Sequence, residues 1–234
     1  IALHWPGGIV MDLQNTRHVW QRQGERFQGD EMARQLDFYF DCSSPWTYLA
    51  FHAIQPLAQE VAAEIAWKPL LVGGVFNAVN QTVYESRAKP NPRKQAYMQK
   101  DMQDWARLYG LTIKFPPTVF PVNSVKCMRG AFVALDEGKL APYAAAAFEA
   151  YWGDDRDLSR EEVLADIATT AGIERQRFFA GIETDSCKAR LRANTDELIA
   201  RGGFGSPTMF VGNDMFFGND RMPLVRAALQ ALAP

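Results

Sequence analysis

The segment Asp41–Trp46 reads Asp-Cys-Ser-Ser-Pro-Trp and joins an apolar strand pattern at residues 36–40 to a helical pattern that follows it. Pro45 suits the first helical position, because its missing N–H would be unpaired there and its fixed φ already fits a helix. Ser44 is then the N-cap, with its hydroxyl oxygen beside several free backbone N–H groups. The pattern therefore predicts either an ordinary cap or a corner that holds a negatively charged atom.

The cysteines and histidines of this chain do not have the spacing of a disulfide framework, a metal site or a Ser-His catalytic pair. The three cysteines, Cys42, Cys127 and Cys187, are widely spaced and form no C-x-x-C pair, so neither a disulfide framework nor a metal site is predicted. This usage favours a reducing, cytoplasmic setting, and Cys42 is expected to be buried and inert. His52 follows Ser44 by eight residues on one helix, roughly 12 Å of rise, which argues against a Ser-His pair.

The composition limits the classes of partner. The chain has 234 residues, of which 47% are hydrophobic and 22% charged, as is typical of a globular protein. A net charge of -2 argues against nucleic acid as the main partner. No stretch of about 18 apolar residues is present, and the first ten residues do not have the pattern of a signal peptide, so no membrane association is expected.

Strand patterns occur at the two ends of the patterned region and helical patterns between them. The first block predicts a strand at 36–40, a helix from 46 and a strand at 63–72, which Gly73-Gly74 is expected to end. The last block predicts strands at 207–211 and 215–217 around a hairpin turn, then a helix at 223–232. Between the two blocks, helices are predicted at 93–109, 121–137, about 140–151, 160–171, 174–181 and 184–201.

The order of these elements predicts an α/β protein. Without residues 73–202 the chain reads β-α-β…β-β-α, which is the plan of a thioredoxin-like domain with a large all-helical insertion. The predicted division is thus a thioredoxin-like domain made of 32–72 and 203–234, and a helical insertion domain at 73–202. Residues 1–31 are weakly patterned and are expected to be an N-terminal extension, either disordered or forming a small docking helix.

Several motifs resemble one known family. The segment from Phe40 to Leu49 is similar to the first strand–helix junction of DsbA-like proteins that include 2-hydroxychromene-2-carboxylate isomerases and kappa-class glutathione transferases. A second resemblance covers Gly203–Val211 and the following Phe217–Met222. Further similar segments lie at 69–76, 92–97 and 148–152. Their order and spacing together identify the chain, from about residue 36 to its end, as a member of this family.

The resemblance implies glutathione as the cofactor. Ser44 matches the catalytic serine that hydrogen-bonds the glutathione sulfur and favours the thiolate. Pro207 matches a cis-proline, and the backbone of Ser206 before it would pair with the cysteinyl backbone of glutathione. Asn219 and Asp220 match the pair that receives the γ-glutamyl end, with Asp220 taking the ammonium group.

The resemblance and the aromatic residues point to one more cofactor contact and to a substrate side of the site. Lys94 matches a basic residue near the glycyl carboxylate, within a basic run from Arg87 that also contains Lys89 and Arg93. Asn80 matches an asparagine beside the site, although the 77–91 loop aligns poorly. Trp46 and Phe76 are expected to line an aromatic pocket for a small aromatic carboxylate substrate.

A serine is sufficient for this chemistry. Lowering a thiol pKa from about 8.5 by two units requires roughly 2.7 kcal/mol. A hydrogen bond to a charged group contributes about 1.5–3 kcal/mol, and a helix N-terminus about 0.3–1 kcal/mol more. Ser44 and Thr47 occupy the two places of a C-x-x-C pair, so this motif excludes a dithiol cycle.

Three functions remain open from the sequence. The first is a glutathione-dependent cis-trans isomerase acting on 2-hydroxychromene-2-carboxylate or a similar intermediate of aromatic catabolism. The second is a kappa-like glutathione S-transferase that conjugates electrophiles through the same thiolate. The third is a non-catalytic thioredoxin-like binding module, which predicts no glutathione affinity. The family also suggests a homodimer.

Overall fold

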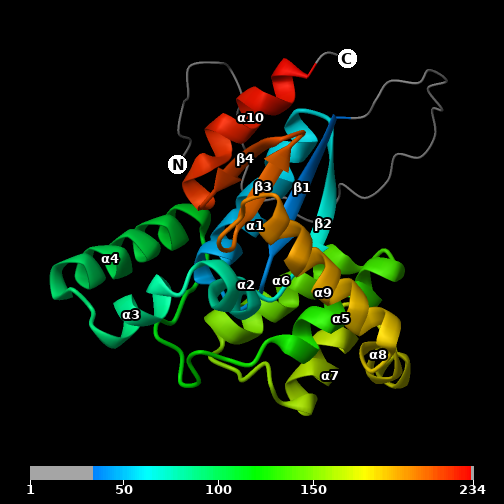
Figure 1. Cartoon of the computed structure of the whole chain (residues 1–234). Helices are drawn as coiled ribbons and strands as arrows, with labels where there is room; N and C mark the ends of the chain where they lie inside the picture. Colours follow the sequence, from blue (N-terminus) through cyan, green and yellow to red (C-terminus); the bar gives the residue numbers. More distant parts are fainter. Residues whose placement is uncertain (1–33, 233–234) are drawn as a thin grey trace, which may run out of the picture. The chain divides into compact units, whose positions relative to one another are not determined.

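A four-stranded sheet in the order β2-β1-β3-β4 lies at the centre of the computed structural model, which describes residues 34–232 (Figure 1). β1 (Arg34–Phe40) pairs in parallel with β2 (Ala63–Pro69) and antiparallel with β3 (Thr208–Val211). β3 in turn pairs antiparallel with β4 (Asp214–Phe217). The predicted order, with a β-α-β block first and a β-β-α block last, is confirmed.

β1 is covered on both faces, which explains its nearly continuous apolar sequence. Side chains alternate along a strand, so Leu36, Phe38 and Phe40 point to one face and Tyr39 points to the other. The first three belong to the main core cluster, and Tyr39 belongs to a smaller cluster that includes Phe210. The central strand thereby joins the two halves of the core.

Helices cover the two faces of the sheet. On the face of the main core lie α1 (Pro45–Glu60), which makes the crossover between β1 and β2, and α10 (Met222–Ala231). On the other face lie α2 (Val72–Val79) and α9 (Asp185–Ala200), which pack against each other. Ser44 caps the start of α1, shortly after β1 ends, so the strand and the helix both position it.

The remaining helices lie between β2 and β3 in the chain. They are α3 (Thr82–Ala88), α4 (Pro92–Tyr109), α5 (Val125–Asp136), α6 (Leu140–Phe148), α7 (Glu161–Thr170) and α8 (Arg175–Ile182), with a π-helical turn at Glu149–Gly153 after α6. α5 lies among α6, α8 and α9 at the lower right of Figure 1. α3 and α4 instead project to the left, and the C-terminal half of α4 packs on α1.

The predicted strand at 63–72 is too long. It ends at Pro69, and Val72–Val79 forms α2, so Gly73 and Gly74 lie within the first turn of a helix and do not end a strand. The residue before α2, Leu71, offers no side-chain cap. The Val72 N–H is instead accepted by the Asp41 carboxylate at 2.9 Å, a partner 31 residues earlier that local sequence reasoning does not supply.

Other boundaries also differ from the predictions. α3 was not predicted, and α5 starts at Val125, four residues after Pro121. The predicted helix at 140–151 becomes α6 followed by the π-helical turn. The helices predicted at 93–109, 160–171, 174–181, 184–201 and 223–232 are confirmed to within one residue at each end.

The described chain forms part of one compact unit, which spans residues 33–234. The main core cluster includes β1 residues such as Leu36 together with α5 and α6 residues such as Phe132 and Phe148. The division into a thioredoxin-like domain and a helical insertion domain at 73–202 stays a prediction about how the chain is organised. The extension predicted at 1–31 lies outside the described residues.

Candidate active site

Ser44 caps α1 and faces the loop before β3. It is extended (φ -107°, ψ 122°), and its Oγ accepts the Thr47 N–H at 3.2 Å, as the Ser-Pro pattern predicts. The same hydroxyl donates to the Ser206 carbonyl oxygen at 3.1 Å. Only 9% of the residue is exposed, so this hydroxyl is a positioned donor in a largely dry corner at a helix N-terminus.

The loop before β3 is fixed to the same corner by its other polar groups. The Ser206–Pro207 peptide bond is cis, at the position predicted for a cis-proline. The Ser206 hydroxyl lies 2.8 Å from Thr47 Oγ1 and accepts the Asp41 N–H at 3.1 Å. Ser44 and Thr47, the residues in the two C-x-x-C places, therefore both hold Ser206.

Asn219 and Asp220 belong to a turn that is bonded to the loop before β3. The Pro207 carbonyl accepts the Gly218 N–H at 3.2 Å, and the 3₁₀ turn Asn219–Arg221 packs against α1. Asn219 is 5% exposed, and its Nδ2 atom has no hydrogen-bond partner among the described residues. Asp220 is exposed and pairs with Arg221 at 2.7 Å. A buried amide donor without an acceptor is costly, which makes Asn219 a candidate ligand contact.

Asp41 is a site residue that the sequence reasoning missed. It is 1% exposed, and its carboxylate accepts the N–H groups of Ser43 and Val72 at 2.9 Å and the Ser124 hydroxyl at 3.1 Å. Burial raises the pKa of this carboxyl above its ordinary value, while the hydrogen bonds oppose that rise. Asp41 thus joins the Ser44 turn to the starts of α2 and α5. An Asp between a buried strand and an N-cap is the signal that could have found it.

Phe76 and Asn80 form a wall beside the loop before β3. A Cβ built on Gly205 would lie 3.8 Å from the Phe76 ring, so the ring lies against the glycine that precedes Ser206. Asn80 ends α2, and its Nδ2 donates to the Phe204 carbonyl at 3.0 Å. Trp46, in the first turn of α1, is half-buried against the main core. The three predicted substrate-side residues therefore lie on the elements that flank the Ser44 corner.

Lys94 is separated from these contacts. It lies in the first turn of α4, where its backbone N–H bonds the Asn91 cap at 3.2 Å and its side chain is exposed. None of the hydrogen bonds or ion pairs of the described residues joins Lys94 to Ser44, Ser206 or Asn219. Its predicted role at the glycyl carboxylate stays a prediction.

The cysteines do not take part in the corner's hydrogen bonds through their thiols. Cys42, Cys127 and Cys187 are all free and buried, as expected for Cys42. Burial raises the pKa of the Cys42 thiol well above its ordinary value, so this thiol stays protonated. The Cys42 carbonyl accepts the Trp152 indole N–H at 2.9 Å, which fixes the corner to the helical layer.

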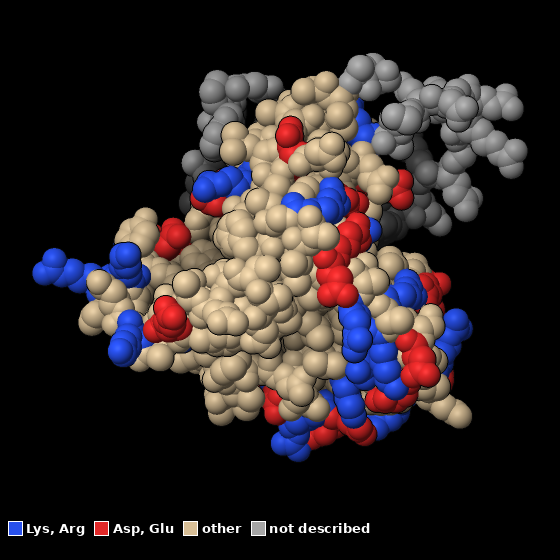
Figure 2. Space-filling view, viewed as in Figure 1, with Lys and Arg blue, Asp and Glu red and all other residues tan. Residues whose placement is uncertain are grey.

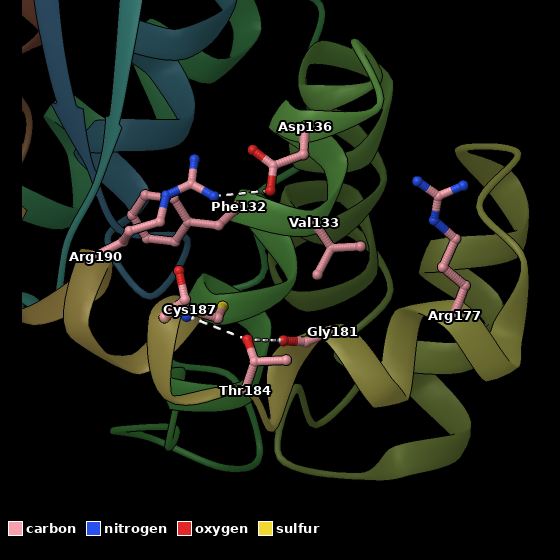
Figure 3. A pocket seen from close by; sticks show the side chains of 9 residues that line it. Phe132, Val133, Asp136, Arg177, Gly181, Thr184, Cys187 and Arg190 are labelled. Carbon is pink, nitrogen blue, oxygen red and sulfur yellow. Dashed lines mark hydrogen bonds and ion pairs between the residues drawn. The ribbon is translucent and has the colours of Figure 1, made fainter.

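A hollow of about 230 Å³ lies elsewhere, between α5, α8 and α9 (Figure 3). Its walls include Cys187, whose N–H is capped by Thr184 at 3.2 Å, and the Arg190–Asp136 ion pair at 2.7 Å. Each of these polar groups already has a partner in the protein. This hollow contains none of the predicted site residues.

Charged side chains are unevenly distributed on the surface viewed in Figure 2. Lys, Arg, Asp and Glu side chains gather at the lower right, over α8 and α9, whereas the face over α2 is largely uncharged. In the described ranges, no cluster of three or more His, Cys, Asp or Glu residues could hold a metal ion. None of the described helices is both long and apolar enough to cross a membrane.

The fold is that of a known class. The family model for the DsbA-like thioredoxin domain matches residues 35–230. The chain therefore belongs to the DsbA-like thioredoxin family, and the predicted fold class is confirmed.

Comparison with individual proteins narrows this class. The chain is 31% identical over 197 residues to 2-hydroxychromene-2-carboxylate isomerase from Pseudomonas putida, a match that covers 84% of this chain and 95% of that protein. A solved structure of 2-hydroxychromene-2-carboxylate isomerase matches with a TM-score of 0.71 and 30% identity, covering 85% of this chain and 95% of the other. Glutathione S-transferase kappa 1 from Rattus norvegicus is 23% identical over 209 residues, covering 82% and 89%. Within the DsbA-like family, the chain belongs to the 2-hydroxychromene-2-carboxylate isomerase family, as its motifs predicted.

Proposed function

We propose that the protein is a glutathione-dependent cis-trans isomerase that acts on 2-hydroxychromene-2-carboxylate or a similar intermediate of aromatic catabolism. The observation that carries this proposal is the Ser44 hydroxyl, a fixed donor at the N-terminus of α1 that faces the cis-proline loop. The isomerase relatives support the reaction class. The kappa transferase relatives support a glutathione cofactor.

The residues around Ser44 fit glutathione. Asn219 has a buried amide donor without a partner among the described residues, and the γ-glutamyl carboxylate is an acceptor that would satisfy it. The exposed Asp220 carboxylate would take the γ-glutamyl ammonium group, in exchange for part of its present contact with Arg221. The backbone of Ser206, at the cis-proline, would take the cysteinyl backbone. Glutathione bound by these contacts would have its sulfur atom beside the Ser44 hydroxyl.

Ser44 is arranged to exchange hydrogen-bond partners. The Ser44 oxygen accepts a hydrogen bond from the Thr47 N–H, and without a bound sulfur the Ser44 hydroxyl donates its own hydrogen bond to the Ser206 carbonyl. Rotation of the hydroxyl proton towards a thiolate would release that carbonyl for a ligand N–H. Ser44 thus needs no base, because its hydroxyl proton is never removed. Asp41 positions this turn without touching the sulfur, through its bonds to Ser43 and Val72.

When bound, glutathione supplies a thiolate that adds to an unsaturated carbon and leaves again after the former double bond has rotated, so no thiol is consumed. The protein's part is to stabilise the thiolate through Ser44 and to position the substrate over the corner. Phe76 and Trp46 offer apolar walls for an aromatic ring, since the surface over α2 carries few charges. An apolar site also strengthens the Ser44 hydrogen bond.

Turnover with and without glutathione tests the proposal. The isomerisation of 2-hydroxychromene-2-carboxylate is followed by absorbance with the wild type and with Ser44→Ala. The proposal expects no turnover above background after glutathione is removed, and a turnover about 2- to 30-fold slower in Ser44→Ala. Turnover that is unaffected by removing glutathione, or unchanged in Ser44→Ala, contradicts the mechanism.

A kappa-like glutathione S-transferase is the second candidate, and the match to the rat transferase favours keeping it. It would use the same Ser44 and Asn219 contacts but leave the sulfur on the product. Rapid conjugation of 1-chloro-2,4-dinitrobenzene without isomerisation of the chromene would establish this alternative. The third candidate, a non-catalytic binding module, predicts no glutathione affinity in calorimetry.

The homodimer and the cytoplasmic location stay predictions. The dimer is tested by light scattering coupled to gel filtration, where a mass near twice 26.3 kDa is expected. Exposed apolar side chains on α4, Tyr97 at 67% and Leu108 at 71%, would be covered if this helix contributes to the dimer contact.

A further inference from the structure

Arg87 is held by aromatic rings at the edge of the proposed site. It lies in the last turn of α3, and its guanidinium carbon is 5.7 Å from the centre of the Phe76 ring and 5.4 Å from that of Phe120. Both distances are within the range of cation–π attraction. The Phe76 ring also meets Tyr84, from the preceding turn of α3, edge-on at 6.3 Å. The guanidinium therefore lies over two ring faces, while the residue as a whole is exposed.

The two rings beside Arg87 are each connected to the Ser44 turn through other residues. Phe76 lies against Gly205, next to Ser206, the residue that Ser44 bonds. Phe120 packs edge-on against Trp152 with ring centres 6.4 Å apart, and the Trp152 indole N–H donates to the Cys42 carbonyl. Phe76 is thus linked to the Ser44 turn through Gly205 and Ser206, and Phe120 is linked to it through Trp152. Arg87 is connected to this site by two separate routes.

Arg87 has no anionic partner in the part of the chain that the structure describes. The ion pairs of residues 34–232 include arginines such as Arg156, Arg190 and Arg201, but not Arg87. An arginine that binds through its ring-facing surface keeps its five N–H donors in the guanidinium plane. This geometry suits a planar carboxylate that approaches along the plane, which two parallel hydrogen bonds would hold.

We propose that Arg87 determines specificity by binding the carboxylate of the substrate while the neighbouring rings contact its aromatic part. This inference rests on the proposed function, because it assigns a group to the substrate side of the same site. It selects planar aromatic acids over neutral aromatics of the same shape. It also separates the two catalytic candidates, since a neutral electrophile such as 1-chloro-2,4-dinitrobenzene has no carboxylate for Arg87.

A matched pair of probes tests the role of Arg87 without relying on turnover. Chromone-2-carboxylate has a planar bicyclic ring and a carboxylate, and chromone lacks only the carboxylate. Their binding to the glutathione-loaded protein is measured by calorimetry for the wild type, Arg87→Leu, Arg87→Lys and the control Lys89→Leu. Lys89 is a neighbouring exposed cation at the end of the same helix, without a ring contact among the described residues.

The expected result is a selective loss. Arg87→Leu should weaken the binding of chromone-2-carboxylate at least tenfold and the binding of chromone less than twofold. The reason is that a site with a charged pair of donors discriminates strongly against an analogue that cannot accept from them. Arg87→Lys should show an intermediate loss, since a lysine presents a point charge without the planar pair of donors. Lys89→Leu should bind both probes within twofold of the wild type.

Two results would overturn the inference. One is a wild-type protein that binds the acid no better than chromone, and the other is an Arg87→Leu variant that loses affinity for both probes equally or for neither. The failure of the proposed function is seen separately, as a wild type without glutathione affinity or without isomerisation. A rise in the KM for 2-hydroxychromene-2-carboxylate in Arg87→Leu, with glutathione affinity unchanged, supports both.

Discussion

Replacement of Ser44 by alanine removes the proposed thiolate donor and leaves most of the corner in place. The Thr47 N–H loses its acceptor at 3.2 Å, and the Ser206 carbonyl loses its donor at 3.1 Å. The Thr47–Ser206 hydroxyl contact and the Asp41 bonds do not involve Ser44 Oγ and are retained. The loss of the cap is expected to cost about 1 kcal/mol of unfolding free energy.

The effect on bound glutathione is of similar size to the effect on stability, but it is measured as a shift of the thiol pKa. A hydrogen bond to a charged acceptor contributes about 1.5–3 kcal/mol, and 1.36 kcal/mol corresponds to one pKa unit. The bond to the Ser206 carbonyl, worth about 1 kcal/mol, is given up when Ser44 turns to the sulfur. The net change is about 0.5–2 kcal/mol, so the thiol pKa of bound glutathione is expected to rise by roughly 0.5–1.5 units in Ser44→Ala.

The assay is the ultraviolet absorbance of the thiolate, titrated against pH for glutathione bound to the wild type and to Ser44→Ala. The matched control is Thr184→Ala, which removes the N-cap of α9, where Thr184 Oγ1 also accepts an N–H at 3.2 Å. The control should lose similar stability without any shift of the titration. A Ser44→Ala midpoint that equals that of the wild type would refute the assignment of Ser44 as thiolate donor.

Four further substitutions test the corner and the packing of the helices. Asp41→Asn leaves at least one of the three donors without its acceptor, so urea unfolding should show a loss of about 1–3 kcal/mol at pH 7, and a loss below 0.5 kcal/mol would contradict the role of Asp41. Because burial raises the Asp41 pKa in the folded state, its contribution to stability is largest at low pH and decreases as the pH rises through that pKa. The stability gap to Asp41→Asn should therefore widen on acidification, and a gap that narrows would contradict the raised pKa. Asn219→Ala should weaken glutathione binding about tenfold in calorimetry while changing unfolding free energy by less than about 0.5 kcal/mol, because the amide Nδ2 has no partner to lose; unchanged affinity would remove Asn219 from the site. Gly130→Ala would bring its Cβ into collision with the Tyr143 hydroxyl and should lower the unfolding free energy by about 1–3 kcal/mol. Gly73→Ala meets nothing within 4 Å and should raise the unfolding free energy by about 0.5–1 kcal/mol by stabilising α2. Equal effects of the two substitutions in thermal unfolding would contradict this packing.

Local signals were enough to predict most elements. The Ser44-Pro45 pair predicts the start of α1, and Gly110, in the left-handed region at φ 68°, ends α4 as its place after an amphipathic pattern indicates. The hairpin around Gly212 follows from a turn signal between two apolar runs. These features depend on residues close in sequence, which is why they can be read from it.

The features that the sequence did not reveal depend on distant partners. α2 begins at Val72 because a carboxylate from Asp41 accepts its N–H, so the two glycines that follow do not have to end a strand. α3 lacks a side-chain cap and a buried face, and it therefore offers no pattern to recognise. The role of Arg87 depends on Phe120, a ring 33 positions later.

The stoichiometry of glutathione tests the central claim most directly. The isomerisation of 2-hydroxychromene-2-carboxylate is measured with glutathione at one hundredth of the substrate concentration, and free thiol is assayed before and after the reaction. The account predicts conversion of many substrate molecules per glutathione until the equilibrium mixture is reached, no conversion without glutathione, and the same amount of thiol at the end as at the start. Conversion that stops when one equivalent of glutathione has been consumed, or that proceeds without any, would contradict it.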